Sequence, residues 1–135
     1  MKKIVLLLSV LFLFNSCSMD DESDKFHYAL LPIESVDIPA EFTLGETYDI
    51  TIRYFRPSTC HAFDGFYYEK NLNTRTIAVQ NVVFEQNNCQ NLTEQLVEQN
   101  LQFYVTSNGS YIFKFWQGKD ATGEDIFLEY EIPVN

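Results

Sequence analysis

Cysteine has the widest chemical repertoire of the residue types in this chain, and two of its three copies lie near the middle of the sequence. Cys60 and Cys89 are separated by 28 residues, and His61 directly follows the first of them. A C-x-x-C redox motif is absent, and a closed zinc site needs four ligands where this segment offers three. In an oxidising compartment the pair favours a disulfide, worth about 3–4 kcal/mol for a loop of this length. His61 is then interpreted as a loop histidine rather than a metal ligand.

Motifs that identify an enzyme are missing from the sequence. The chain has no G-x-S-x-G, no H-E-x-x-H, no glycine-rich phosphate loop and no dinucleotide fingerprint. Neither His27 nor His61 lies in a recognisable catalytic segment. Carboxylates are abundant, but no spacing singles out the pair that a glycosidase would need. We therefore expect no catalytic residues, no cofactor and no enzymatic activity.

The acidic segment 120–125 has the residue types of a hard-cation site. Asp120, Glu124 and Asp125 surround Gly123, and calcium prefers six to eight oxygen ligands on a loop that can bend. The alternating acids and the distal bidentate glutamate of an EF-hand are absent. Asp and Gly are also the residues that a polar hairpin turn requires, and we favour that interpretation.

Aromatic side chains make up 16% of the sequence and supply its other candidate site. About half of them can face a core, and the alternation of the predicted strands directs Tyr67, Tyr104 and Trp116 outward. Exposed aromatic rings stack on sugar rings or anchor protein partners. The alternatives are that a second structural layer covers these three rings, or that they are scattered exposed residues.

The N-terminus has the pattern of an export signal. A positive segment, Met1 to Lys3, precedes an apolar run from Ile4 to Phe14, and Cys17 follows where a small-residue cleavage site belongs. This apolar run is too short to cross a bilayer of about 30 Å. Acidic residues lie directly behind the cysteine, from Asp20 to Asp24.

These features of residues 1–24 resemble a loose lipobox, of the type found in surface lipoproteins of the Bacteroidetes. The resemblance implies cleavage before Cys17, acylation of that cysteine, and anchoring of the protein by lipid in the outer membrane of the cell envelope, exposed at the surface. It divides the chain into a signal peptide (1–16), an acylated cysteine with an acidic spacer (17–25) and a folded domain (26–135). An ordinary secretory peptide cleaved elsewhere is the alternative.

Net charge narrows the class of partner. The formal charge is −10, and removal of residues 1–16 with their two lysines would leave −12. Such a charge disfavours nucleic acid and anionic lipid headgroups as partners. It is compatible with cations, basic proteins or neutral sugars, and solubility alone also explains it.

Short β-rich runs separated by turn residues cover the rest of the chain. The clearest is Thr47 to Phe55, in which Tyr48, Ile50, Ile52 and Tyr54 alternate with polar residues. The alternation of the run 76–85 slips near Asn81, which suggests a bulge or a bend there, and Asn108-Gly109 predicts a hairpin. The predicted strands span residues 33–38, 47–55, 63–69, 76–85, 97–106, 111–117 and 126–134.

About seven strands in a single domain predict an immunoglobulin-like antiparallel β-sandwich, with a lipocalin-type barrel as the alternative. Trp116 follows both cysteines, so the antibody signature is absent. Tethering, a rigid sandwich and the lack of a catalytic motif together favour a non-catalytic binding or accessory module for protein or glycan. A structural subunit of an envelope complex is the second interpretation, and a small hydrolase with an unrecognised site is the third.

Overall fold

The computed structural model describes residues 25–135, which form eight β-strands and no helix. No helix long and apolar enough to cross a membrane is therefore present in this part of the chain. The strands are β1 (Phe26–Leu31), β2 (Ile33–Asp37), β3 (Thr47–Phe55), β4 (His61–Asn71), β5 (Thr74–Phe84), β6 (Leu96–Tyr104), β7 (Tyr111–Lys119) and β8 (Asp125–Ile132).

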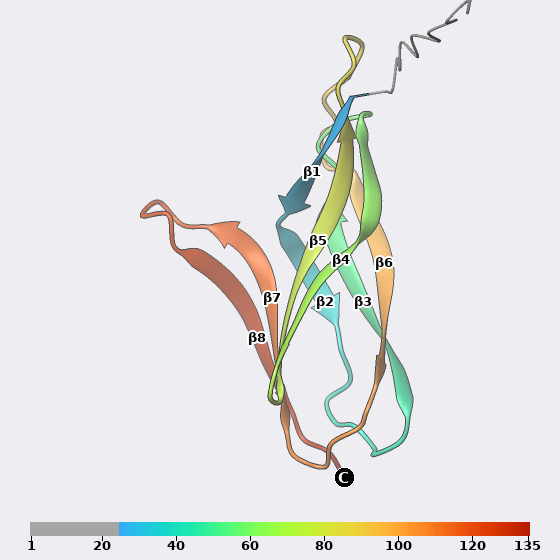
Figure 1. Ribbon diagram of the computed structural model, residues 1–135, viewed down its shortest axis with the longest axis vertical. Helices are drawn as coiled ribbons and strands as arrows, with labels where there is room; N and C mark the ends of the chain where they lie inside the picture. The colour runs from blue at the N-terminus through green and yellow to red at the C-terminus, as the bar shows by residue number, and fades with distance from the viewer. Residues whose placement is uncertain (1–24) are drawn as a thin grey trace, which may run out of the picture.

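The strands form two packed sheets (Figure 1). The five-stranded sheet has the order β1-β5-β7-β8, with β4 on the other edge of β5, and the three-stranded sheet has the order β2-β3-β6. This architecture confirms the prediction of an all-β, immunoglobulin-like sandwich. The pairing departs from a purely antiparallel arrangement in one place, because β5 and β7 run parallel.

The core lies between the two sheets and is rich in aromatic side chains. In β7, Tyr111, Phe113 and Phe115 are fully buried, while Ile112, Lys114 and Trp116 face outward, as the alternation predicts. Ile50, Ile52 and Tyr54 of β3 line the opposite wall, and Phe42 inserts between the sheets. The rings of Phe103 and Tyr111 meet edge to face at 4.9 Å between centroids. This geometry stabilises an aromatic pair in addition to the burial of its surface.

The prediction of a hairpin at Asn108-Gly109 is wrong, because β6 and β7 belong to different sheets. The connection instead crosses the sandwich and is held by Tyr111. Its hydroxyl accepts hydrogen bonds from the backbone N–H groups of Thr106 and Ser107, at 3.1 and 2.9 Å. A core tyrosine thus satisfies donors that a tight hairpin would direct to a partner strand.

The bulge expected near Asn81 lies in the neighbouring strand instead. The register between β4 and β5 shifts between Phe63 and Phe66, where Gly65 has a φ of 98°. Asn81 itself is fully buried at an inward position of β5. The alternation of inward and outward side chains in β5 is therefore regular. The alternation of apolar and polar residue types is interrupted because a polar residue, Asn81, occupies a core position.

The strand β1 is absent from the predicted strands, and it ends where Pro32 leads the chain from one sheet to the other. The predicted strand 33–38 corresponds to β2, which is an outer strand of the three-stranded sheet.

A fork opens along one edge of β5. Since β4 occupies the other edge throughout, β1 and β7 share this edge: β7 pairs with it from Thr74 to Ile77, and β1 pairs with it from Val79 to Phe84. Beyond Phe115, β7 leaves β5 and continues only as a hairpin with β8. Figure 1 shows this hairpin, in orange and red, curving away from the body of the sandwich.

Candidate functional site

The fork between β1 and the β7–β8 hairpin contains a cavity of about 440 Å³ on the outer face of the five-stranded sheet. Five strands contribute to its lining, so no single segment of the sequence describes it. The lining residues are Leu30, Tyr67, Glu69, Thr76, Ala78, Trp116, Lys119, Asp125 and Phe127, and we call this cavity the aromatic pocket.

A small residue between two large ones creates the aromatic pocket. Tyr67 of β4 is paired with Ala78 of β5, and Trp116 of β7 is paired with Phe127 of β8. Since neighbouring strands lie about 4.8 Å apart and β7 leaves β5 after Phe115, the backbones carrying Tyr67 and Trp116 are separated by at least two strand spacings, roughly 10 Å, with β5 between them. Ala78 fills little of that width, so the two rings form walls and its methyl group forms the floor.

The bulge in β4 gives Tyr67 its outward position. Phe63 and Phe66 both face the core, and their rings meet at 5.1 Å between centroids. In a regular strand Tyr67 would share the face of Phe63, because side chains four residues apart point the same way. The extra residue at Gly65, whose φ of 98° suits glycine, reverses the alternation and turns Tyr67 outward.

Asp125 holds the tryptophan wall in place. Its Oδ1 accepts hydrogen bonds from Lys119 Nζ at 2.9 Å and from Trp116 Nε1 at 3.0 Å. Lys119 first, and Trp116 second, hold the pKa of Asp125 below its ordinary value. Both contacts use the same oxygen, and within residues 25–135 the Oδ2 atom has no hydrogen-bond donor.

Glu69 fixes the opposite wall. The Tyr67 hydroxyl donates to Glu69 Oε2 at 2.7 Å, and this hydrogen bond raises the pKa of Tyr67. In the described part of the chain no lysine, arginine or histidine lies within ion-pair distance of Glu69. The aromatic pocket therefore contains one carboxylate paired with a lysine and one that is not.

The acidic segment 120–125 forms the tip of the β7–β8 hairpin. Asp120 Oδ1 accepts hydrogen bonds from Thr122 N, Thr122 Oγ1 and Glu124 N, and these contacts lower the pKa of Asp120. The carboxylate of Asp120 thus stabilises the turn, which agrees with the interpretation of this segment as a polar hairpin turn. Between residues 25 and 135, no group of three or more His, Cys, Asp or Glu side chains is arranged to hold a metal ion. Asp125 belongs to the aromatic pocket instead.

The three aromatic residues predicted to face outward do not share one site. The structure brings Tyr67 and Trp116 together across Ala78. Tyr104 is 57% exposed, but it lies on β6 of the three-stranded sheet, opposite Thr47. Two of the three predicted residues, Tyr67 and Trp116, thus line the aromatic pocket, and Tyr104 lies away from it on the other sheet.

The sequence did not single out several pocket residues. Phe127 lies beside Trp116 and Lys119 beside Asp125 only because the β7–β8 register shifts between Trp116 and Lys119, which alternation does not reveal. Glu69 follows Tyr67 by two residues on β4, so the two side chains lie on the same face of the sheet. Leu30 and Ala78 gave no such signal, because their place depends on which strands lie beside β5.

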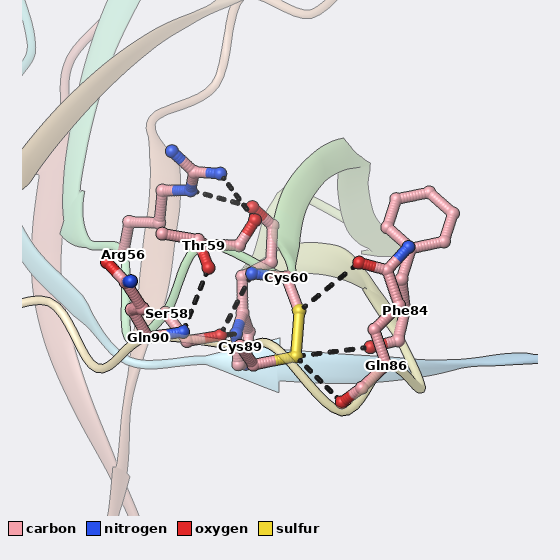
Figure 2. The surroundings of a disulfide bond; sticks show 9 residues. Arg56, Ser58, Thr59, Cys60, Phe84, Gln86, Cys89 and Gln90 are labelled. Carbon is pink, nitrogen blue, oxygen red and sulfur yellow. Dashed lines mark hydrogen bonds between the residues drawn. A yellow bond between two sulfur atoms is a disulfide. The ribbon is translucent and has the colours of Figure 1, made fainter.

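The predicted disulfide between Cys60 and Cys89 is present, with a Cα–Cα distance of 5.5 Å (Figure 2). It joins the loop before β4 to the loop after β5. Beside it, Thr59 N donates to Gln90 O at 2.9 Å, and Gln90 N donates to Thr59 Oγ1 at 3.0 Å. Cys89 Sγ lies 3.3 Å from the carbonyl oxygen of Gln86, which is a close contact and not a hydrogen bond, because a disulfide sulfur carries no proton.

Both histidines have local partners. His61 Nδ1 lies 2.7 Å from Ser58 Oγ, which agrees with its interpretation as a loop residue. Burial, followed by the charges of His27 and Arg56, lowers the pKa of His61. His27 lies on β1, with its Nδ1 3.4 Å from Glu85 Oε1.

The sequence matches no protein-family model, and neither a curated protein nor a solved structure is significantly similar to the chain. Cys17 and the rest of the predicted lipoprotein signal lie outside the described residues. The function must therefore be inferred from the aromatic pocket and the sequence.

Proposed function

We propose that this chain is a lipid-anchored cell-envelope protein whose folded domain binds a glycan, without catalysis, in the aromatic pocket. The observation that carries the proposal is the pairing of two aromatic walls with carboxylates that orient them. Tyr67 and Trp116 face the same cavity, and Glu69 and Asp125 hydrogen-bond to these rings at its rim.

A sugar suits this combination of groups. The two faces of a pyranose ring expose C–H bonds, which stack on aromatic rings, while its hydroxyl groups project outward to polar side chains. Pockets for small ligands usually enclose about 300–1,000 Å³, and the aromatic pocket falls within that range. A protein partner would instead need a contact surface of about 800 Å² on each side.

The ionised state of Asp125 excludes it as the general acid of a glycosidase. A glycosidase needs one carboxylic acid whose pKa is raised, so that it can protonate the leaving group. Asp125 has the opposite perturbation, because Lys119 and Trp116 stabilise its ionised form. A small hydrolase remains the rival function, and release of shorter products from a bound oligosaccharide would establish it.

The membrane anchor is proposed from the sequence of residues 1–24. Residues 18–25 could reach at most about 28 Å, so acylation of Cys17 would keep the aromatic pocket close to the membrane. Mass spectrometry of membrane-extracted protein should find an acylated Cys17 as the first residue. A Cys17→Ala variant that stays fully membrane-bound would contradict this anchor. Degradation of the domain by protease on intact cells would support surface exposure.

Glycan-array binding by the full chain in mild detergent tests the pocket. Trp116→Ala should abolish binding, because it removes one wall and leaves Asp125 without one donor. Tyr104→Ala is the matched control, since it removes an exposed aromatic ring from the other sheet. The pocket assignment fails if Trp116→Ala binds as well as the wild type or if Tyr104→Ala loses binding equally.

A second candidate, a structural subunit of an envelope complex, has one observation in its favour. Phe26, Tyr28 and Leu30 project from the outer face of β1 and are 51%, 58% and 44% exposed. A neighbouring protein could cover this strip, as burial of exposed apolar surface drives association. Purification of the chain from mildly solubilised envelopes in a stable stoichiometric complex would favour this candidate, whereas a monomer would favour the glycan-binding module.

A further inference from the structure

We infer that the aromatic pocket selects uncharged sugars that carry two adjacent hydroxyl groups, and that it rejects the corresponding acidic sugars. This inference rests on the proposed glycan-binding function and specifies the class of ligand. Three features of the pocket carry it: the Lys119–Asp125 pair, the coupling of Asp125 to Trp116, and the unpaired charge of Glu69.

Lys119 and Asp125 together offer one donor and one acceptor side by side. Lys119 Nζ donates to Asp125 Oδ1 at 2.9 Å and approaches Gly123 O at 3.4 Å, so one of its three N–H groups has no partner in the described residues. Asp125 Oδ2 is likewise without a donor there. Adjacent hydroxyls of a pyranose lie about one hydrogen-bond length apart. One hydroxyl can therefore donate to Oδ2 while its neighbour accepts from Nζ.

The same carboxylate also sets the stacking surface. Trp116 Nε1 donates to Asp125 Oδ1 at 3.0 Å, so the plane of the indole ring is fixed relative to the atoms that would bind the hydroxyls. A sugar stacked on Trp116 would present its edge to Lys119 and Asp125. This arrangement lowers the cost of ordering the site on binding, because both parts are already oriented.

Glu69 supplies the discrimination by charge. Lys119 neutralises Asp125, whereas Glu69 binds only the uncharged Tyr67 hydroxyl, at 2.7 Å. The aromatic pocket therefore carries one net negative charge, inside a chain whose formal charge is −10. A uronic acid would bring a second negative charge into this space, and like charges at close range repel. An uncharged sugar has no such cost.

Matched pairs of oligosaccharides test the inference. The full chain in mild detergent is titrated by calorimetry with two pairs of trisaccharides, mannotriose with trimannuronate and galactotriose with trigalacturonate, chosen with the same linkage and anomeric configuration within each pair so that they differ only in the carboxylate. We expect at least one neutral trisaccharide to bind, with its uronate at least about tenfold weaker at low salt, and a smaller ratio at high salt. Equal or tighter binding of the uronates would overturn the inference and leave the glycan-binding function standing. Absence of binding by all four probes and by a broad glycan array would overturn the proposed function itself.

Two variants separate the contribution of Glu69 from that of Lys119. Glu69→Gln should reduce the neutral-to-acidic affinity ratio to within about threefold, and Glu131→Gln, which removes a charge from β8 outside the pocket, should leave the ratio unchanged. Lys119→Met should weaken the neutral sugar about tenfold, because the hydroxyl donor is lost. If Lys119→Met instead weakens only the uronate, the lysine recognises an anion and the inference is wrong. Unchanged thermal melting of each variant shows that the hairpin still folds.

Discussion

The C-terminal end of β5 and the region near its middle are held together in different ways. At the C-terminal end of β5, the Cys60–Cys89 disulfide and the backbone hydrogen bonds around it tie the loops 56–61 and 84–92 to each other (Figure 2). Near the middle of β5, β7 leaves that strand after the Ile77–Phe115 pair, and the β7–β8 hairpin continues without it. Gln117 Nε2 donates to Ile33 O at 3.1 Å there, next to the fork.

This difference separates the parts that stabilise the fold from the parts that contact a ligand. A covalent link reduces the conformational entropy of the unfolded chain, and its effect does not depend on leaving any surface free. A pocket needs the opposite: strands that diverge, so that side chains on neighbouring strands leave space between them. Ala78 and Val83 are five residues apart on β5, about 17 Å, so the pocket and the disulfide end of the strand can be altered separately.

Removal of the disulfide should have the largest effect on stability. The double variant Cys60→Ala/Cys89→Ala should lose about 3–4 kcal/mol in the free energy of unfolding, because the unfolded chain regains the freedom of that loop. Urea unfolding followed by circular dichroism measures this loss. Glycan affinity of the folded fraction should be unchanged, and a parallel loss of affinity would show that the disulfide end of β5 and the aromatic pocket are coupled.

Gly118→Ala tests the register shift in β7 between the pocket residues Trp116 and Lys119. Gly118 has a φ of 95°, so a side chain there should cost about 1–2 kcal/mol in stability. The new Cβ would lie 3.4 Å from Pro32 Cγ, which is near contact distance, so the main cost is backbone strain. Because this residue lies where the hairpin meets β2, the variant should also weaken glycan binding.

Gly123→Ala is the control for that variant. Gly123 also has a positive φ, of 85°, but it lies in the turn at the far end of the hairpin. The control should lose similar stability and retain most of the affinity. If both variants bind equally well, the register shift in β7 does not set the shape of the aromatic pocket.

Ala78→Leu should remove binding, and because Ala78 is buried the larger side chain should also cost about 1–3 kcal/mol in stability. The larger side chain would occupy the floor between Tyr67 and Trp116, and we expect at least a tenfold loss of affinity, about 1.4 kcal/mol. Calorimetry with the neutral trisaccharides measures the affinity, and thermal melting measures the stability. Full binding by this variant would show that the ligand does not enter the space above Ala78.

The smallest effect is expected from pH at the disulfide end. Since the folded structure lowers the pKa of His61 below 6.5, the unfolded chain binds a proton more readily. The contribution of His61 to stability is thus fully present above that value and is lost as the pH falls from about 6.5 toward the lowered pKa. Urea midpoints at pH 7.5 and 5.5 measure it, and His61→Asn should reduce the difference between them.

Local alternation explains which predictions from the sequence were right. In β3 and in the first part of β7 every second residue is buried, so the pattern marks both the strand and its inward face. Trp116 was assigned outward on this basis, whereas the outward position of Tyr67 depends on the bulge at Gly65. The strand β1 was missed because its large apolar residues, Phe26 and Tyr28, lie on the exposed face, where alternation carries no information about burial.

Long-range pairing explains which predictions were wrong. The Asn108-Gly109 turn has the local preference of a hairpin, but the buried Tyr111 binds the turn from inside the sandwich and the two strands enter different sheets. The polar Asn81 suggested a bulge, although it lies at a regular inward position. In both cases a buried side chain overrides a preference that is encoded within a few residues.

The sequence by itself determined the class of fold, the inward faces of the clearest strands and the pair of cysteines that form the disulfide. These properties depend on residue type and on a period of two, which can be read along a single strand. Only the tertiary structure decided that Tyr67 and Trp116 meet across Ala78, and that Glu69 and Asp125 orient them. The physical reason is that β5 takes its neighbours from distant parts of the chain, β4 on one edge and β1 and β7 on the other, and the pocket exists only where the last two diverge.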